Sequence, residues 1–146
     1  MNKEHPHAPH RYLNYTLKQA QHALRKKLDR QLRPLGLTVP QFGALAFLDF
    51  SPGLSNAQLA RDTFVTPQSM QGILVNLEKA GYIARHPHPE HGRILRVELT
   101  EQGKAVLTQA FSICDEVESK LRQAVYPLSY EEALSMLQRC RDVLEE

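Results

Sequence analysis

The segment Thr66–Thr100, TPQSMQGILVNLEKAGYIARHPHPEHGRILRVELT, decides the fold of this chain. It opens on a Thr–Pro pair, which is typical of a helix start, because threonine caps free backbone amides and proline is tolerated at the first helical position. Apolar residues then recur at the spacing of one buried helical stripe, in Met70, Ile73, Leu74 and Leu77. Gly81 is expected to end this helix.

Two short strands are predicted directly after this helix. Ile94–Leu99 alternates apolar and charged residues, which is typical of a half-buried strand, and Ile83–His86 is its expected partner. Residues 86–93, HPHPEHGR, are expected to form a loop tip, because their two prolines lack the N–H groups that a strand ladder needs. A short helix, Ser55–Phe64, is predicted before the segment. Two helices, a tight link and a hairpin together outline a winged helix-turn-helix.

The remainder of the chain is predicted to be helical. A long amphipathic helix covers residues 13–32, and Pro34 and Gly36 end it. Thr100 caps another long helix, which Pro127 interrupts. Capping boxes, in which a Ser or Thr and the Gln or Glu three residues later exchange hydrogen bonds, are predicted at Thr38/Gln41, Ser55/Gln58 and Ser129/Glu132. The expected fold class is mainly α, with a small antiparallel β-wing between N- and C-terminal dimerisation helices.

This pattern divides one structural domain into functional segments. Residues 1–10 are expected to be a flexible tail. Residues 11–36 and 105–146 are expected to form dimerisation helices, because their apolar stripes are too long for one small lobe to bury. Residues 37–104 form the expected DNA-binding lobe.

Charge is unevenly distributed along the chain, although the formal net charge is only +2. Residues 1–36 carry eight basic and two acidic side chains, and residues 105–146 carry four basic and eight acidic ones. Residues 55–104 carry six basic and five acidic side chains, so the central segment is not strongly basic. Binding to DNA would then need a few Arg and Lys side chains acting with polar ones, with the basic first helix as a candidate addition. Solvated helix faces explain the same charges.

The candidate DNA contacts follow from the helix-turn-helix plan, in which the second helix presents its first residues to base edges. Off the buried stripe lie Gln68, Ser69, Gln71 and Gly72. Glutamine can pair in a bidentate way with adenine, and serine can donate or accept. Arg93 at the hairpin tip could enter a narrow minor groove. The candidates for phosphate contacts are Arg61, Asn76, Lys79, Arg85 and Arg96.

The chain resembles the MarR family of bacterial transcriptional regulators. The motifs that carry this resemblance are Leu37-Thr38-x-Pro-Gln41-Phe42-x-x-Leu45, Leu59-Ala60, Leu77-Glu78-x-x-Gly81-Tyr82-Ile83, and Arg93 followed by Leu99-Thr100-x-x-Gly103. The resemblance implies a homodimer whose two lobes bind a pseudo-palindromic operator, usually as a repressor released by a small molecule or an oxidant. One departure concerns the wing: the family often has Asp two residues before the wing arginine, and this chain has His91 there, beside Glu90.

The resemblance also implies a small-molecule site where the first, second and fifth helices meet the DNA-binding lobe. The candidate ligand-binding residues are Tyr12, Tyr15, His22, Phe42 and Phe47. Most residues of these types in such positions are simple core residues.

Other functions stay open at this point. A metal sensor could use His5, His7 and His10 or His86, His88 and His91, although both clusters lie in Pro-rich loops without cysteine and no metal or cofactor is expected. A redox sensor could use Cys114 or Cys140, which lie in apolar helical patterns. A winged helix can also serve as a protein-docking module without DNA binding.

Enzymes and membrane proteins are not expected. No Gly-rich phosphate loop or carboxylate pair stands out, and acidic residues 115, 116 and 118 follow Cys114 and disfavour a thiolate nucleophile. No apolar run approaches the roughly 18 residues that cross a bilayer. The two distant cysteines suit a reduced, cytoplasmic protein.

Overall fold

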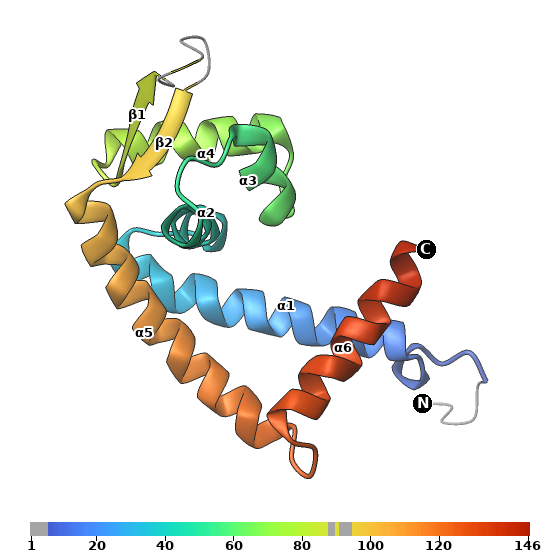
Figure 1. Ribbon diagram of the computed structural model, residues 1–146. Coiled ribbons are helices and arrows are strands. Elements are labelled where there is room, and N and C mark those ends of the chain that lie inside the picture. The colour runs from blue at the N-terminus through green and yellow to red at the C-terminus, as the bar shows by residue number, and fades with distance from the viewer. Residues whose placement is uncertain (1–5, 88–89, 91–94) are drawn as a thin grey trace. The chain divides into compact units, whose positions relative to one another are not determined.

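The computed structural model describes residues 6–87, 90 and 95–146, and these fall into two compact units with the boundary between Ala110 and Phe111 (Figure 1). The fold is mainly helical, with a two-stranded antiparallel sheet, as the sequence predicts. None of the described helices is long and apolar enough to span a membrane.

The first unit begins with a single 3-10 turn, η1 (Pro9–Arg11), followed by the long helix α1 (Leu13–Leu32). The bounds of α1 match the predicted helix. Its end differs slightly, because a second 3-10 turn, η2 (Arg33–Leu35), follows before Gly36 adopts a left-handed conformation. The mobility expected of residues 1–10 stays a prediction.

Three short helices build the lobe that follows α1: α2 (Val39–Phe50), α3 (Asn56–Asp62) and α4 (Pro67–Lys79). The predicted capping boxes at the starts of α2 and α3 are confirmed, with both reciprocal hydrogen bonds present in each. The predicted cap of α4 is also confirmed, since the hydroxyl of Thr66 accepts a hydrogen bond from the Ser69 amide. Each such cap satisfies backbone donors that a helix start would otherwise leave free.

The hairpin comprises β1 (Ile83–Pro87) and β2 (Leu95–Leu99), paired in the register Ile83↔Leu99 to Pro87↔Leu95. The expectation that the tip begins at His86 is wrong, because β1 continues through His86 and Pro87. Both strands of a two-stranded sheet are edge strands, and edge strands tolerate a proline.

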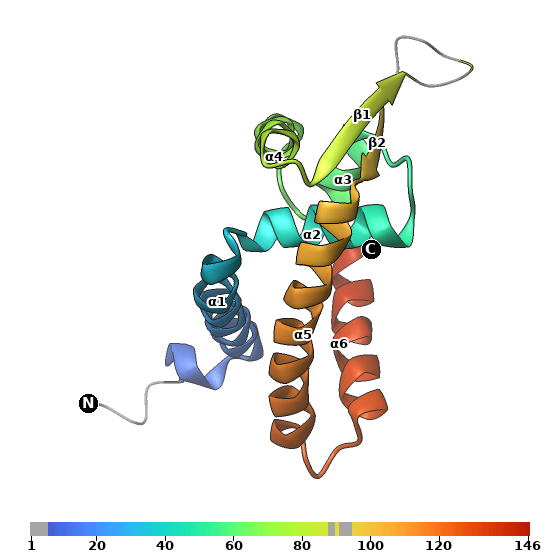
Figure 2. The same cartoon turned by 90° about the vertical axis from the view of Figure 1, so that its left-hand side faces the viewer.

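The core of the lobe lies around α2, which is between α1 and the α3–α4 pair (Figure 1) and also contacts β2. Figure 2 shows the hairpin standing beside α4. The predicted stripe of α4 packs into this core, with Met70, Leu74 and Leu77 fully buried and Ile73 half-buried. Burying each such side chain contributes roughly 1.5–3 kcal/mol, so the inner face of α4 is fixed and its opposite face stays exposed.

The base of the hairpin is joined to the start of α5 (Glu101–Ala124). The Thr100 amide donates to the Tyr82 carbonyl (3.1 Å), and the Thr100 hydroxyl donates to the Gly81 carbonyl (2.5 Å). The same hydroxyl accepts from the Gly103 amide (3.0 Å), as the predicted cap requires. Gly103 is packed so closely that a Cβ there would overlap the Tyr82 carbonyl oxygen.

The second unit consists of the end of α5 and α6 (Tyr130–Glu145), which starts with the predicted capping box at Ser129. The Tyr130 hydroxyl donates to Glu118 (3.0 Å), and the Arg122 guanidinium lies over the Tyr130 ring. Within these 36 residues only Val117 and Ala133 are buried. Large apolar side chains stay exposed at Leu121, Leu128, Leu134, Leu137, Val143 and Leu144.

Candidate nucleic-acid interface

The start of α4 is held in place from two sides. The Thr66 hydroxyl accepts from the Ser69 amide (3.1 Å) and donates to the Ser69 hydroxyl oxygen (2.9 Å). The side-chain amide of Asn56, in the first turn of α3, donates to the Pro67 carbonyl (3.1 Å). The first turn of α4 is therefore fixed to α3 by hydrogen bonds as well as by its buried stripe.

All four candidate base-contacting residues are exposed on this helix. Gln68, Ser69, Gln71 and Gly72 lie away from the buried stripe. The Ser69 hydroxyl already accepts a hydrogen bond, so its own hydrogen is available to a further acceptor. A Cβ at Gly72 would meet no heavy atom within 4 Å, so packing inside the described chain gives no reason for a glycine in this helix. This face offers the side-chain amides of two glutamines and the hydroxyl of Ser69 as hydrogen-bonding groups. Gly72 adds no side chain, so a base edge can approach the helix closely.

Three of the candidate phosphate contacts flank this face. Arg61 on α3, and Asn76 and Lys79 toward the end of α4, are exposed. Arginine and lysine of this kind can neutralise phosphates, and asparagine can donate to them.

Two other candidates are turned toward the lobe itself. Arg85 on β1 forms an ion pair with Glu78 of α4 (Nε–Oε2, 3.6 Å), and its side chain is only 15% exposed. The Arg96 guanidinium on β2 lies against the turn at Gly53, where a Cβ would come within 3.2 Å of it. The structure therefore does not bring Arg85 and Arg96 onto the exposed face of α4. Their neighbours come from other elements, which the sequence pattern alone does not reveal.

The wing tip is only partly described. Arg93, the candidate for the minor groove, and His91 lie outside the described residues. Glu90 is described and exposed. The role of Arg93 stays a prediction.

A cleft of about 340 Å³ lies between α1, α2 and the α3–α4 link. Phe42 and Phe47 line it, as expected of a ligand site, whereas Tyr12, Tyr15 and His22 do not. Sequence reasoning missed the other apolar residues of its wall, namely Leu24, Leu28, Val39, Pro40, Phe64 and Val65. Two features of the sequence could have indicated this wall. Leu24 and Leu28 lie one helical turn apart on α1, and Phe64 is a large apolar residue in a short link between helices.

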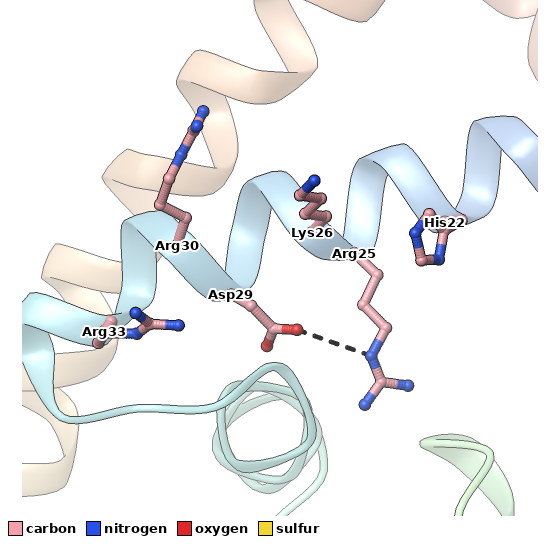
Figure 3. A pocket seen from close by; sticks show the side chains of 6 residues that line it. All are labelled: His22, Arg25, Lys26, Asp29, Arg30 and Arg33. Atoms are coloured by element: carbon pink, nitrogen blue, oxygen red, sulfur yellow. Dashed lines mark ion pairs between the residues drawn. The ribbon is translucent and has the colours of Figure 1, made fainter.

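Basic side chains gather along the second half of α1 and at Arg33, which follows it (Figure 3). A shallow groove there is lined by His22, Arg25, Lys26, Asp29, Arg30 and Arg33. Arg25 forms an ion pair with Asp29 (3.7 Å), and Asp29 also accepts from the Val39 amide (3.3 Å). Arg25 lines the apolar cleft as well as this groove, so the cleft has a cation at its edge.

The two sensor hypotheses find little support in the described residues. Burial, followed by the charges of Glu118 and Asp115, raises the pKa of the Cys114 thiol, which disfavours the reactive thiolate. Among the described residues no three His, Cys, Asp or Glu side chains come together as metal ligands. His5, His88 and His91 lie outside those residues, and the His7 Nδ1 lies 2.5 Å from the Tyr12 hydroxyl.

Comparison with known proteins identifies the family. Residues 35–94 match the sequence profile of the MarR family. The HTH-type transcriptional repressor Rv2887 of Mycobacterium tuberculosis (strain ATCC 25618 / H37Rv) is 44% identical over 101 residues, which cover 69% of this chain and 73% of the relative. This chain belongs to the MarR family.

Solved structures of that MarR family protein resemble the chain over almost its whole length. The crystal structure of M. tuberculosis Rv2887 in complex with DNA has a TM-score of 0.73 and 35% identity, covering 88% of this chain and 97% of the other. The complex of the same protein with salicylic acid has a TM-score of 0.69 and 32% identity, covering 98% and 99%. The MarR fold inferred from the sequence motifs is thus confirmed.

Proposed function

We propose that this MarR-family protein is a homodimeric, sequence-specific DNA-binding transcriptional regulator, and specifically a repressor released by a small aromatic ligand. The observation that carries the proposal is the exposed start of α4. There Gln68, Ser69, Gln71 and Gly72 face outward from a helix that two sets of hydrogen bonds and a buried stripe hold in place. The DNA complex of the related Rv2887 supports the same role.

The contacts to DNA divide between bases and phosphates. The four residues at the start of α4 meet base edges, and Arg93 on the wing enters the minor groove. Arg61, Asn76 and Lys79 bind phosphates. Arg85 can bind a phosphate only if it leaves Glu78, and Arg96 only if it leaves the Gly53 turn. We therefore expect these two arginines to contribute less to DNA affinity than Arg61 and Lys79.

The second unit supports dimerisation. Its 36 residues bury only Val117 and Ala133. The exposed leucines and valine of α5 and α6 therefore need a second copy of the chain to cover them. A two-fold dimer places the two α4 helices in successive major grooves of a pseudo-palindromic operator. In this assembly residues 11–36 and 105–146 serve dimerisation, and residues 37–104 serve DNA binding.

The cleft between α1, α2 and the α3–α4 link is the proposed effector site. Its phenylalanine walls suit an aromatic ring. Arg25 and Asp62 line the cleft with opposite charges, so an anionic ligand would have to bind on the Arg25 side and compete with Asp29 for its guanidinium. The complex of Rv2887 with salicylic acid, an aromatic acid, supports this class of ligand. A ligand weakens DNA binding only to the extent that it prefers the conformation that does not fit DNA.

The alternatives have weaker support. A protein-docking winged helix would not need the exposed amide and hydroxyl groups that the start of α4 presents. Among the described residues, the shifted pKa values belong to Cys114, Tyr130, Glu132 and Arg141, and none of these lines the cleft or belongs to α4. A role in the cytoplasm follows from the proposed regulation of transcription.

The experiment that tests the proposal is a binding selection from a pool of random DNA duplexes. We expect the recovered duplexes to share two inverted half-sites whose centres lie about 10 base pairs, or a multiple of this, apart. Sedimentation of the free protein should show a dimer at micromolar concentration. Recovery of duplexes without any common sequence would reject sequence-specific recognition.

A further inference from the structure

The link between α3 and α4 has a phenylalanine where helix ends usually have glycine. Phe64 has a φ of 57°, in the left-handed region, and is the one non-glycine residue with positive φ among those described. The Val65 amide donates to the Ala60 carbonyl (3.0 Å), and the Phe64 amide donates to the Arg61 carbonyl (3.3 Å). These two bonds form a Schellman motif, whose left-handed position favours glycine because a side chain there crowds the backbone.

The Phe64 ring also lacks the burial that could offset this strain. Its residue is 95% exposed, while Leu59 and Ala60 in the preceding helix are fully buried. A strained backbone conformation combined with a large exposed aromatic ring does not serve the stability of the lobe. Such residues concentrate at functional sites, where strain is part of the mechanism.

Phe64 lies at the apolar cleft described above. Leu24 and Leu28 of α1, and Phe42 and Phe47 of α2, form the other walls, and the volume of about 340 Å³ is suited to a small molecule rather than to a helix. The neighbouring residue, Thr63, is packed against α2, since a Cβ at Gly43 would come within 3.2 Å of the Thr63 methyl carbon. The link is therefore in contact with the helix that forms the floor of the cleft.

We propose that Phe64 couples this cleft to the recognition helix: an aromatic molecule bound in the cleft packs on the Phe64 ring and thereby displaces the link that positions α4. The inference rests on the proposed function, because it presupposes DNA binding that an effector weakens. Phe64 is two residues before Thr66, the N-cap of α4. A change of the Phe64 backbone breaks the Schellman bonds and shifts the helix start that carries Gln68 and Gln71.

The test compares Phe64→Ala and Phe64→Gly with the unmodified protein, using salicylate as the probe. Both changes remove the ring, and the glycine also removes the backbone strain. Phe50→Ala is the matched control, because Phe50 is 87% exposed and does not line the cleft. For each protein the ratio of its Kd for the selected duplex with saturating salicylate to its Kd without salicylate gives the coupling factor. Calorimetry on each variant establishes saturation, so a weaker salicylate site does not imitate lost coupling.

We expect a coupling factor of about 10 for the unmodified protein and for Phe50→Ala, and below about 3 for both Phe64 variants. A Phe64→Ala protein with the coupling factor of the unmodified protein would overturn the inference. So would loss of coupling in the glycine variant alone, since that result would assign the effect to backbone strain rather than to the ring.

Failure of the proposed function gives a different pattern. A protein that binds no duplex fails at the first measurement, before any variant is compared. A protein that binds the selected duplex but shows a coupling factor of 1 refutes release by this aromatic acid, and the role of Phe64 is refuted with it.

Discussion

Replacing Gly103 with alanine is expected to lower the melting temperature by about 8–15 °C, the equivalent of roughly 2–4 kcal/mol in a chain of this size. The physical reason is the contact between the start of α5 and the base of the hairpin. A Cβ on Gly103 would overlap the carbonyl oxygen of Tyr82, and its distance to the carbonyl carbon would be only 2.9 Å. Backbone atoms cannot move aside as a side chain can, so the strand or the helix has to shift.

The control for this prediction is the same substitution elsewhere. Gly72 is in the middle of α4, and a Cβ there meets nothing within 4 Å. Gly72→Ala should therefore raise stability by about 0.5–1 kcal/mol, because alanine is the better helix former. Thermal unfolding followed by circular dichroism measures both. Equal melting temperatures for Gly103→Ala and the unmodified protein would show that the hairpin is not joined to α5 as described.

The second large effect is expected on DNA binding. Gln71→Ala should weaken binding to the selected duplex by about 1–3 kcal/mol, a factor of roughly 5–150, because the change removes a bidentate partner of a base. Binding to random DNA should fall by less than about twofold, because phosphate contacts supply most of that affinity. Fluorescence anisotropy with both duplexes measures the difference.

Gln102→Ala is the matched control for Gln71, since Gln102 is also an exposed glutamine within a helix, outside α4 and outside the segments proposed to serve dimerisation. We expect it to leave both affinities unchanged. If Gln71→Ala weakens selected and random duplexes by the same factor, Gln71 does not contact a base.

Features encoded by neighbouring residues could be predicted from the sequence. The capping boxes at Thr38, Ser55 and Ser129 depend on two side chains three residues apart, and all three are present. The inner face of α4 follows from helical spacing, which places Gln68 and Gln71 on the exposed side, as the structure confirms.

Features that depend on other elements could not be predicted in this way. Alternation along β1 and β2 indicates which side of the sheet a residue occupies, but not that Glu78 meets Arg85 or that the Gly53 turn meets Arg96. The left-handed conformation of Phe64 depends on the Schellman bonds of the folded link, whereas a phenylalanine in a sequence gives no sign of positive φ. The strand pairing of Pro87 likewise depends on the edge position of β1.

The most direct test of the account is the salt dependence of binding to the selected duplex. Arg61, Lys79 and Arg93 of each protomer are the proposed cationic contacts to phosphates and the minor groove, which gives about six cations per dimer and a slope of log K against log salt near −5. Affinity should then fall roughly 1000-fold between 50 and 200 mM salt. A slope near −9 would mean that Arg85 and Arg96 also leave their neighbours to bind phosphate. Absence of binding to any duplex at 50 mM salt, or an affinity that does not change with salt, would contradict the claim that α4 and the wing form a DNA-binding surface.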